Sequence, residues 1–204
     1  MTRYDFYIHT YEDNPLRIIR ELEQFHPESR VILISDGGMK NYDHPLFHKF
    51  DERLKHKSHK WIIRWFDLIR EYGSNIAVKV DPDSVCFREF RIPFPDALFF
   101  GSINSEYHKG KLWRYIHGGA QFITKEFIDL IYDQLQNGDF SGEQFRYKGG
   151  KMISADKILC FLAEKNNIPL VNYLDVGSGP NGFSGRQALS NHGYAIIHSR
   201  KMTR

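Results

Sequence analysis

The stretch AVKVDPDSVCF, residues 77–87, runs from an apolar strand pattern directly into two carboxylates, Asp81 and Asp83. As a bare pattern Asp-x-Asp is weak evidence, because the chain holds 14 Asp in 204 residues and about one such match is expected by chance. Its position is stronger evidence, since ligands of open α/β sheets bind beyond the carboxyl ends of the strands. The stretch is either a proline turn around Pro82 or a carboxylate pair for a divalent cation, and its position favours the cation.

On both sides of this stretch the sequence alternates between strand and helix patterns. Strands are predicted at residues 4–10, 29–36, 75–80, 96–103, 168–173 and 194–199. Helices are predicted at residues 14–25, 60–73 and 154–167, and residues 118–135 are predicted to form a short strand that turns into a helix. The first helix has Asn14 as its N-cap and Pro15 in its first position. This alternation predicts an α/β fold with three layers around a central, mostly parallel sheet.

The composition is that of an ordinary soluble, globular chain, with 41% hydrophobic and 26% charged residues. A net charge of +3 is too small for a typical nucleic-acid-binding domain, so no nucleic-acid partner is expected. No stretch approaches the ~18 apolar residues of a membrane span. Cys86 and Cys160 lie in apolar runs without Cys-x-x-Cys spacing, which predicts buried thiols in a cytoplasmic protein.

Basic residues are concentrated in the run RLKHKSHKWIIR, residues 53–64. The run is either a solvated loop and helix start or a local anion site, in which Lys60 and Arg64 would contact phosphate. Zinc is disfavoured for the histidines in and before this run, because no cysteine accompanies them and the loop is polar. These histidines are His44, His48, His56 and His59.

Residues 177–182 contain a formal dinucleotide fingerprint, Gly177-x-Gly179-x-x-Gly182, which also resembles the glycine-rich motif of class I methyltransferases. The fingerprint requires an acidic residue about 20 positions later, and no Asp or Glu follows Asp175. We therefore interpret this segment as a flexible loop near the site, and a methyltransferase is disfavoured.

The first strand-to-helix turn, HTYEDNP at residues 9–15, contains no glycine that would cradle a pyrophosphate. A bound diphosphate would instead need a metal ion and cationic side chains to neutralise it. Asp81 and Asp83 would hold the metal ion. The candidate cationic side chains are Lys60, Arg64, Arg200 and Lys201.

Taken in order, several segments of the chain resemble the GT-A class of nucleotide-sugar glycosyltransferases. They are HTYEDNP, ISDG, VKVDPDSVCF, IHGGAQFITKEF, SADKILCFLAEKN and IIHSRK, and they cover nearly the whole chain. The resemblance implies a GT-A (Rossmann-like) fold in one domain, 1–204, with a nucleotide-binding half before about residue 100 and a sugar and acceptor half after it. Within this class the chain is similar to a small glycosyltransferase domain at the start of a larger chlorella-virus protein. That similarity implies further domains in a longer chain and a location in the host cytoplasm.

The resemblance assigns a group of residues near the first two strands to the nucleotide. Tyr11 would pack against the uracil, with Thr10 and Glu12 beside it. Asp36 would accept a hydrogen bond from the uracil imide. The alternative for Asp36 is a turn aspartate before two glycines.

The same resemblance assigns a metal site. Asp81 would face the ribose and the metal, Asp83 would bind the metal directly, and His198 would complete the ligand set. Carboxylate and imidazole ligands are compatible with Mn²⁺, and carboxylates with Mg²⁺. His198 alternatively has a structural role, as lone histidines often do.

Two further segments would handle the sugar and the acceptor. Gly118 and Gly119 would let the backbone approach the donor hexose, the alternative being a plain turn. Asp156 lies where inverting members carry a catalytic carboxylate, although Ser154 and Ala155 depart from the acidic residue expected before it. Its alternative is a helix-start aspartate stabilised by the helix dipole.

The sequence therefore predicts a metal-dependent enzyme that moves a hexose or deoxyhexose from a UDP-sugar to a glycan hydroxyl. Inversion follows if Asp156 is the general base. One alternative is a sugar nucleotidyltransferase, disfavoured because its usual glycine- and lysine-rich first loop is missing. The other is a non-catalytic module that binds carbohydrate or protein through its aromatic side chains.

Overall fold

The computed structural model describes residues 4–10, 14–35, 41–50, 59–89, 94, 96–147, 150, 152–178 and 195–198. Its elements are, in chain order, β1 (Asp5–Thr10), α1 (Leu16–Phe25), β2 (Arg30–Ser35), β3 (Phe47–Lys49), α2 (His59–Tyr72), β4 (Ile76–Val80), β5 (Ser84–Cys86), β6 (Phe99–His108), β7 (Lys111–Thr124), α3 (Lys125–Asn137), the 3₁₀ helix η1 (Glu143–Phe145), α4 (Ala155–Lys165), β8 (Leu170–Asn172), β9 (Val176–Ser178) and β10 (Ile196–His198). No helix in these ranges is both long enough and apolar enough to cross a membrane.

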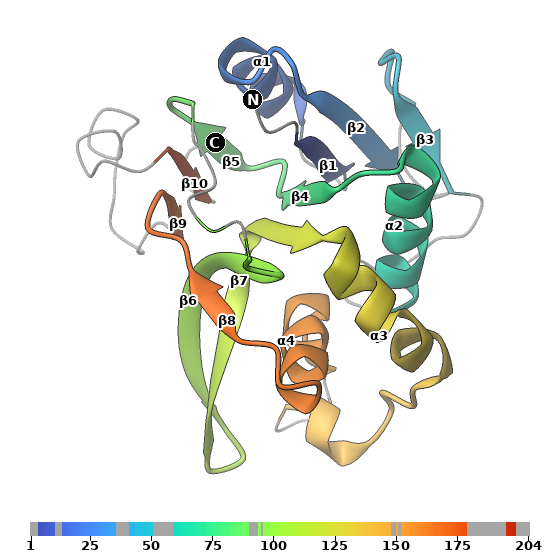
Figure 1. The fold of residues 1–204 in the computed structure, drawn as a ribbon, viewed down its shortest axis with the longest axis vertical. Coiled ribbons are helices and arrows are strands. Elements are labelled where there is room, and N and C mark those ends of the chain that lie inside the picture. The colour runs from blue at the N-terminus through green and yellow to red at the C-terminus, as the bar shows by residue number, and fades with distance from the viewer. Residues whose placement is uncertain are drawn as a thin grey trace.

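The central sheet has seven strands in the order β3-β2-β1-β4-β7-β6-β8 (Figure 1). Strand β7 runs antiparallel to both of its neighbours, and the other four neighbouring pairs are parallel. A smaller sheet has the order β5-β10-β9. The predicted α/β fold with a mostly parallel sheet is confirmed.

The central sheet is buried on both faces, and successive residues of its strands enter different cores. Tyr7, Ile34 and Ala77 pack in one core with α2, α3 and α4. Their neighbours Ile8 and Val78 pack in the other core with α1 and the smaller sheet. The molecule therefore has three layers. The assignment of its two halves to nucleotide and acceptor stays a prediction.

Strands β6 and β7 form a long hairpin that the sequence patterns did not predict. Residues 118–135 were expected to begin with a short strand, but β7 already begins at Lys111. The two strands are joined by Lys109 and Gly110, both with positive φ, the backbone of a tight hairpin turn. The mixed polar and aromatic residues before Gly118 gave no clear strand period.

Smaller differences concern short elements and one helix start. Strands β3, β5 and β9 have three residues each, too few for a periodic pattern to be recognised. Helix α1 begins at Leu16, with Pro15 as N-cap, so the expected cap was wrong by one position. Asn14 still accepts a hydrogen bond from the Leu16 N–H, at 3.1 Å.

Candidate functional site

The segment after β4 is both a turn and a carboxylate pair. The N–H of Ser84 donates to the carbonyl of Asp81 at 3.0 Å, which closes a turn around Pro82. The turn lies at the carboxyl end of β4, with Asp81 partly buried and Asp83 only 8% exposed. The two interpretations of this stretch are therefore compatible.

The backbone of Gly119 holds this turn at both ends. Its carbonyl accepts from the N–H of Asp81 at 3.2 Å and from Oγ of Ser84 at 3.0 Å. Gly118 and Gly119 lie where the β6–β7 register shifts, between the pairs Gly101–Gln121 and Ile103–Ile116. A Cβ on Gly101 would lie 2.6 Å from Cγ2 of Ile116, so only glycine fits this close approach. The predicted sugar-binding segment is thus joined to the predicted metal-binding turn.

Helix α1 supports the strand that follows the turn. Arg17 donates through Nη2 to the carbonyl of Ser84 at 3.0 Å, and Glu21 accepts from the N–H of Cys86 at 2.8 Å. The sequence analysis did not identify these residues. Their i, i+4 spacing on a predicted helix was the available signal.

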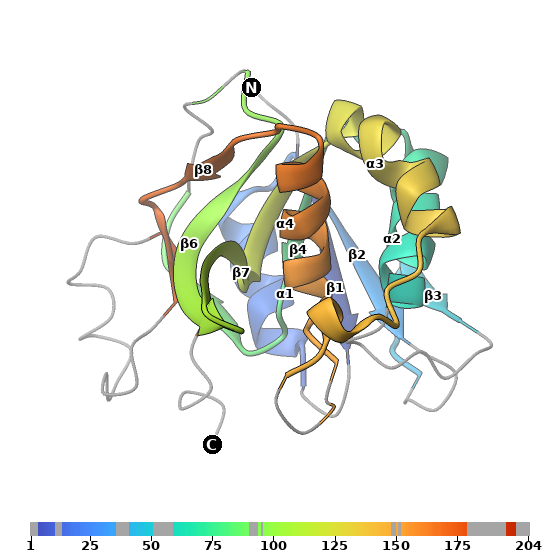
Figure 2. The ribbon, with the colours of Figure 1, turned by 90° about the horizontal axis from the view of Figure 1, so that it is seen from below.

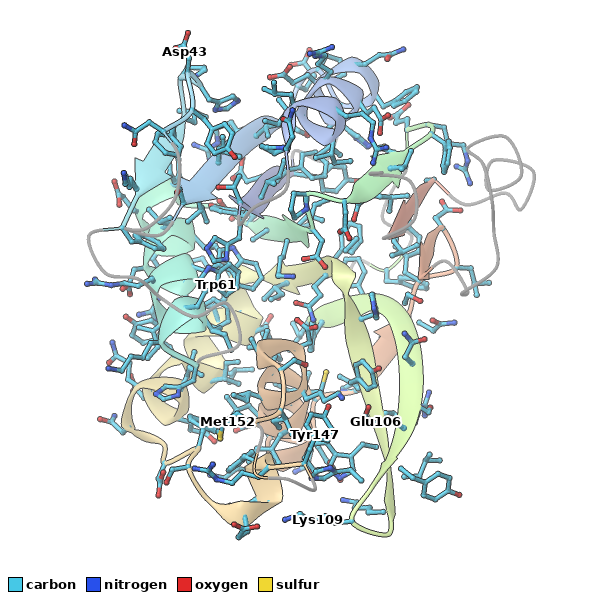
Figure 3. The ribbon with its side chains drawn as sticks, turned by 180° about the vertical axis from the view of Figure 1, so that it is seen from behind. Asp43, Trp61, Glu106, Lys109, Tyr147 and Met152 are labelled. Carbon is cyan, nitrogen blue, oxygen red and sulfur yellow. The ribbon has the colours of Figure 1, made fainter. Side chains whose placement is uncertain are left out.

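Lys79 is the residue of this site that the sequence analysis missed. It is 7% exposed, and its Nζ donates to Oδ1 of Asp81 at 2.6 Å. It lies 6.0 Å from the ring centre of Trp61, which points from α2 toward the sheet (Figure 3). A lysine inside the apolar run IAVKV, two residues before Asp81, was the signal for it.

Three carboxylates interact electrostatically with the Lys79 ammonium, and one of them, Asp81, is hydrogen-bonded to it. Burial by itself lowers the pKa of Lys79, but Asp81, Asp156 and Asp83 together raise it above its ordinary value. Asp156 lies in the first turn of α4 and is partly buried. The charge of the predicted base therefore acts on the lysine that is hydrogen-bonded to the predicted metal-binding turn, although the two segments are far apart in the sequence.

Two buried polar atoms near Lys79 have no hydrogen-bond partner in the described part of the chain. They are Nε1 of Trp61 and Oε1 of Gln121, the residue opposite Lys79 on β7. Native proteins leave few buried polar atoms unpaired, and such atoms often mark a site that takes a water molecule or a ligand.

The donor set fits the predicted Mn²⁺ or Mg²⁺. Carboxylate oxygens are the ligands that such ions prefer, and Asp81 and Asp83 lie in one turn at the carboxyl end of β4. Strand β10 places the backbone of His198 opposite Ser84, next to Asp83. Within the described ranges no three His, Cys, Asp or Glu side chains already form a metal-binding group.

The other predicted site residues are less closely associated with this cluster. Thr10 is buried, and its hydroxyl donates to the carbonyl of Ile34 at 3.1 Å. Lys60 and Arg64 are exposed on α2, and Arg64 lies 3.9 Å from Asp67. The remaining predicted residues lie outside the described part of the chain; they are Tyr11, Glu12, Asp36, Arg200 and Lys201.

The histidines considered for zinc contact separate partners where they are described. His44 accepts from the N–H of Leu46 at 3.2 Å, and His48 hydrogen-bonds the hydroxyl of Tyr72 at 2.5 Å. The ring of His59 lies 5.2 Å from that of Phe140. These contacts account for the three side chains individually.

The sequence and the structure were each compared with those of known proteins. No family model matches the sequence, and no curated protein matches it. Among solved structures, the chain matches that of a glycosyltransferase involved in the glycosylation of the major capsid of PBCV-1, with a TM-score of 0.54 over 98% of this chain and 96% of that chain. The chain has a GT-A glycosyltransferase fold. Since the two sequences are 11% identical, the likeness shows the fold alone, and the residue roles stay predictions.

Proposed function

We propose that the protein is a glycosyltransferase that moves a hexose or deoxyhexose from a UDP-sugar to a carbohydrate hydroxyl, with inversion at the anomeric carbon. The observation that carries the proposal is the turn with Asp81 and Asp83 at the carboxyl end of β4 in a GT-A fold, where Asp81 is hydrogen-bonded to the buried Lys79 and the charges of Asp83 and Asp156 act on the same lysine. Ligands of open α/β sheets bind at this edge.

On the donor side, Tyr11, Thr10, Glu12 and Asp36 would bind the uridine, and the backbone at Gly118 and Gly119 would approach the sugar. Asp81, Asp83 and His198 would hold Mn²⁺ or Mg²⁺. When bound, the cation supplies positive charge beside the diphosphate leaving group. Lys79 would keep the Asp81 carboxylate ionised and fixed in direction through their 2.6 Å hydrogen bond. Lys60, Arg64 and Lys201 are the candidate contacts for the phosphates.

On the acceptor side, Asp156 would act as general base. It would take the proton from the acceptor hydroxyl as that oxygen attacks the anomeric carbon and the bond from that carbon to the diphosphate oxygen breaks. Attack from the side opposite to the leaving group inverts the configuration. The electrostatic interaction of Asp156 with Lys79, which is hydrogen-bonded to Asp81, supports this role.

The experiment is a calorimetric titration of UDP with Mn²⁺ or with EDTA, followed by UDP release from UDP-glucose, UDP-galactose, UDP-xylose and UDP-rhamnose. Asp83→Asn should weaken metal-dependent UDP binding by at least about tenfold. Asp156→Asn should keep UDP affinity and lower turnover by roughly 10²–10⁴-fold. Asp133→Asn, on the exposed side of α3, is the matched control. Wild-type protein that does not bind UDP would contradict the proposal, and normal turnover in Asp156→Asn would exclude the assigned base.

A further inference from the structure

A groove of about 360 Å³ lies between α4 and the β6–β7 hairpin, which run alongside each other (Figure 2). Its volume is at the lower end of small-molecule sites, about 300–1,000 Å³. This is enough for one or two sugar rings. The residues that line it include Trp113, Arg114, Lys157, Phe161, Glu164 and Leu170.

Contacts between the hairpin and α4 fix the width of the groove. The buried ammonium of Lys157, one of the lining residues, hydrogen-bonds Glu106 of β6 and the hydroxyl of Tyr147, which lie side by side in Figure 3. The same ammonium lies 4.6 Å from the ring centre of Tyr115. At the rim, Lys111 of β7 pairs with Glu164 of α4 at 2.9 Å. A groove held in this way binds its ligand with little ordering cost.

The lining suits a carbohydrate. Trp113 and Phe161 are partly buried aromatic side chains, and the ring of His108 supports Trp113 at 4.9 Å between ring centres. Arg114 and Glu164 are exposed charged residues of the same lining. A sugar ring has apolar C–H faces and hydroxyl edges, so it can use the aromatic surface and the charged groups together.

The position of the groove connects it to the proposed base. Lys157 follows Asp156 in the first turn of α4, and Cys160, one helical turn beyond Asp156, also lines the groove. We propose that this groove is the subsite for the saccharide acceptor, which would direct one hydroxyl toward Asp156. This inference rests on the proposed function.

The test measures glycan binding and UDP binding separately. Wild type, Trp113→Ala and Glu164→Ala would be applied to an array of printed bacterial, plant and animal glycans, and UDP affinity would be measured by calorimetry. Tyr107→Ala is the matched control, because Tyr107 is 81% exposed on the same hairpin and does not line the groove. Trp113→Ala should weaken glycan binding by about tenfold or more, and Glu164→Ala by about threefold. Tyr107→Ala should match wild type, and all variants should keep UDP affinity.

The outcomes separate the two proposals. Glycan binding that survives Trp113→Ala and Glu164→Ala would overturn the groove assignment, as would wild type that binds UDP but no glycan on the array. Glycan binding that depends on Trp113, in a protein that does not bind UDP, would support the groove and contradict the glycosyltransferase. Thermal unfolding checks that each variant is folded, and the exposed Glu164 provides the test if Trp113→Ala is unstable.

Discussion

Two lysines are buried to nearly the same depth in the described chain, Lys79 on β4 at 7% exposure and Lys157 on α4 at 5%. Burial lowers the pKa of each ammonium, and in each case oxygen partners raise it above its ordinary value. Each also lies within two residues of a predicted site carboxylate, Asp81 or Asp156. By depth and local sequence the two lysines are alike.

Their partners differ. Lys157 pairs with one carboxylate, Glu106, and with the hydroxyl of Tyr147, so its charge is balanced by a single acid. Lys79 is hydrogen-bonded to Asp81 and also interacts electrostatically with Asp83 and Asp156, which belong to separate parts of the chain. A buried pair of one lysine and one acid is explained by structure alone, whereas a buried lysine that interacts with several carboxylates marks a candidate functional site. The comparison therefore separates a structural clamp from a candidate site more clearly than burial does.

The largest effect is expected for Lys79→Met. The substitution would break the hydrogen-bonded pair with Asp81 and remove the positive charge that also acts on Asp83 and Asp156, which should lower the free energy of unfolding by about 3–5 kcal/mol at pH 7. Mn²⁺ should recover roughly 1 kcal/mol or more of this loss, because it binds the folded state and supplies positive charge there. Urea unfolding with Mn²⁺ and with EDTA measures both quantities. Equal effects of Mn²⁺ on the variant and on wild type would remove the distinction between the two lysines.

Lys157→Met should have a smaller effect that Mn²⁺ does not change. Glu106 keeps 28% of its side chain exposed, so water can partly solvate it after the lysine is lost, and a destabilisation of about 3 kcal/mol is expected. In a double-mutant cycle, Glu106→Gln should cost less in the Lys157→Met background than in wild type. Additive losses would show that the two side chains do not form a coupled pair.

Much of the fold could be predicted because its long strands and helices are locally encoded. Strands β1, β2 and β4 are apolar runs, and α2 is bounded by Gly73, which adopts the positive φ that ends a helix. The hairpin tip could not be predicted, because its strands gain their order from pairing rather than from a periodic pattern.

The candidate site was predicted in part for a related reason. The carboxylates could be found because they follow strand and helix patterns in the sequence. That the charge of Asp156 acts on Lys79 depends on how α4 packs against the sheet, which no local pattern records. The same holds for the groove, whose walls are more than 40 residues apart along the chain.

His26 should make the free energy of unfolding depend on pH, in wild type and in both lysine variants. This histidine is 6% exposed among Tyr4 and Phe6, and burial lowers its pKa to about 4. In the unfolded chain His26 binds its proton near pH 6.5. The contribution of the neutral His26 to the free energy of unfolding is therefore fully present above that pH and is lost as the pH falls toward 4. With a pKa of about 4 in the folded state and about 6.5 in the unfolded chain, the loss should be about 2 kcal/mol between pH 7 and pH 5. His26→Gln should remove this part of the pH dependence of urea unfolding, and an unchanged profile would show that other groups cause it.

The smallest effect is expected for Lys125→Met, which tests whether burial or distance sets the energy of these pairs. Lys125 and Asp129 are 2.5 Å apart on α3, as close as Lys79 and Asp81, but both are exposed. Arg70 also contacts Asp129, at 3.2 Å, and a lysine in the first turn of a helix opposes the helix dipole. The free energy of unfolding should therefore change by less than about 0.5 kcal/mol in urea unfolding at pH 7. A loss above about 1 kcal/mol would mean that a short nitrogen–oxygen distance stabilises such a pair even when both side chains are exposed to water. The difference between Lys79 and Lys157 would then have to be established by measuring the coupling energy of each pair separately.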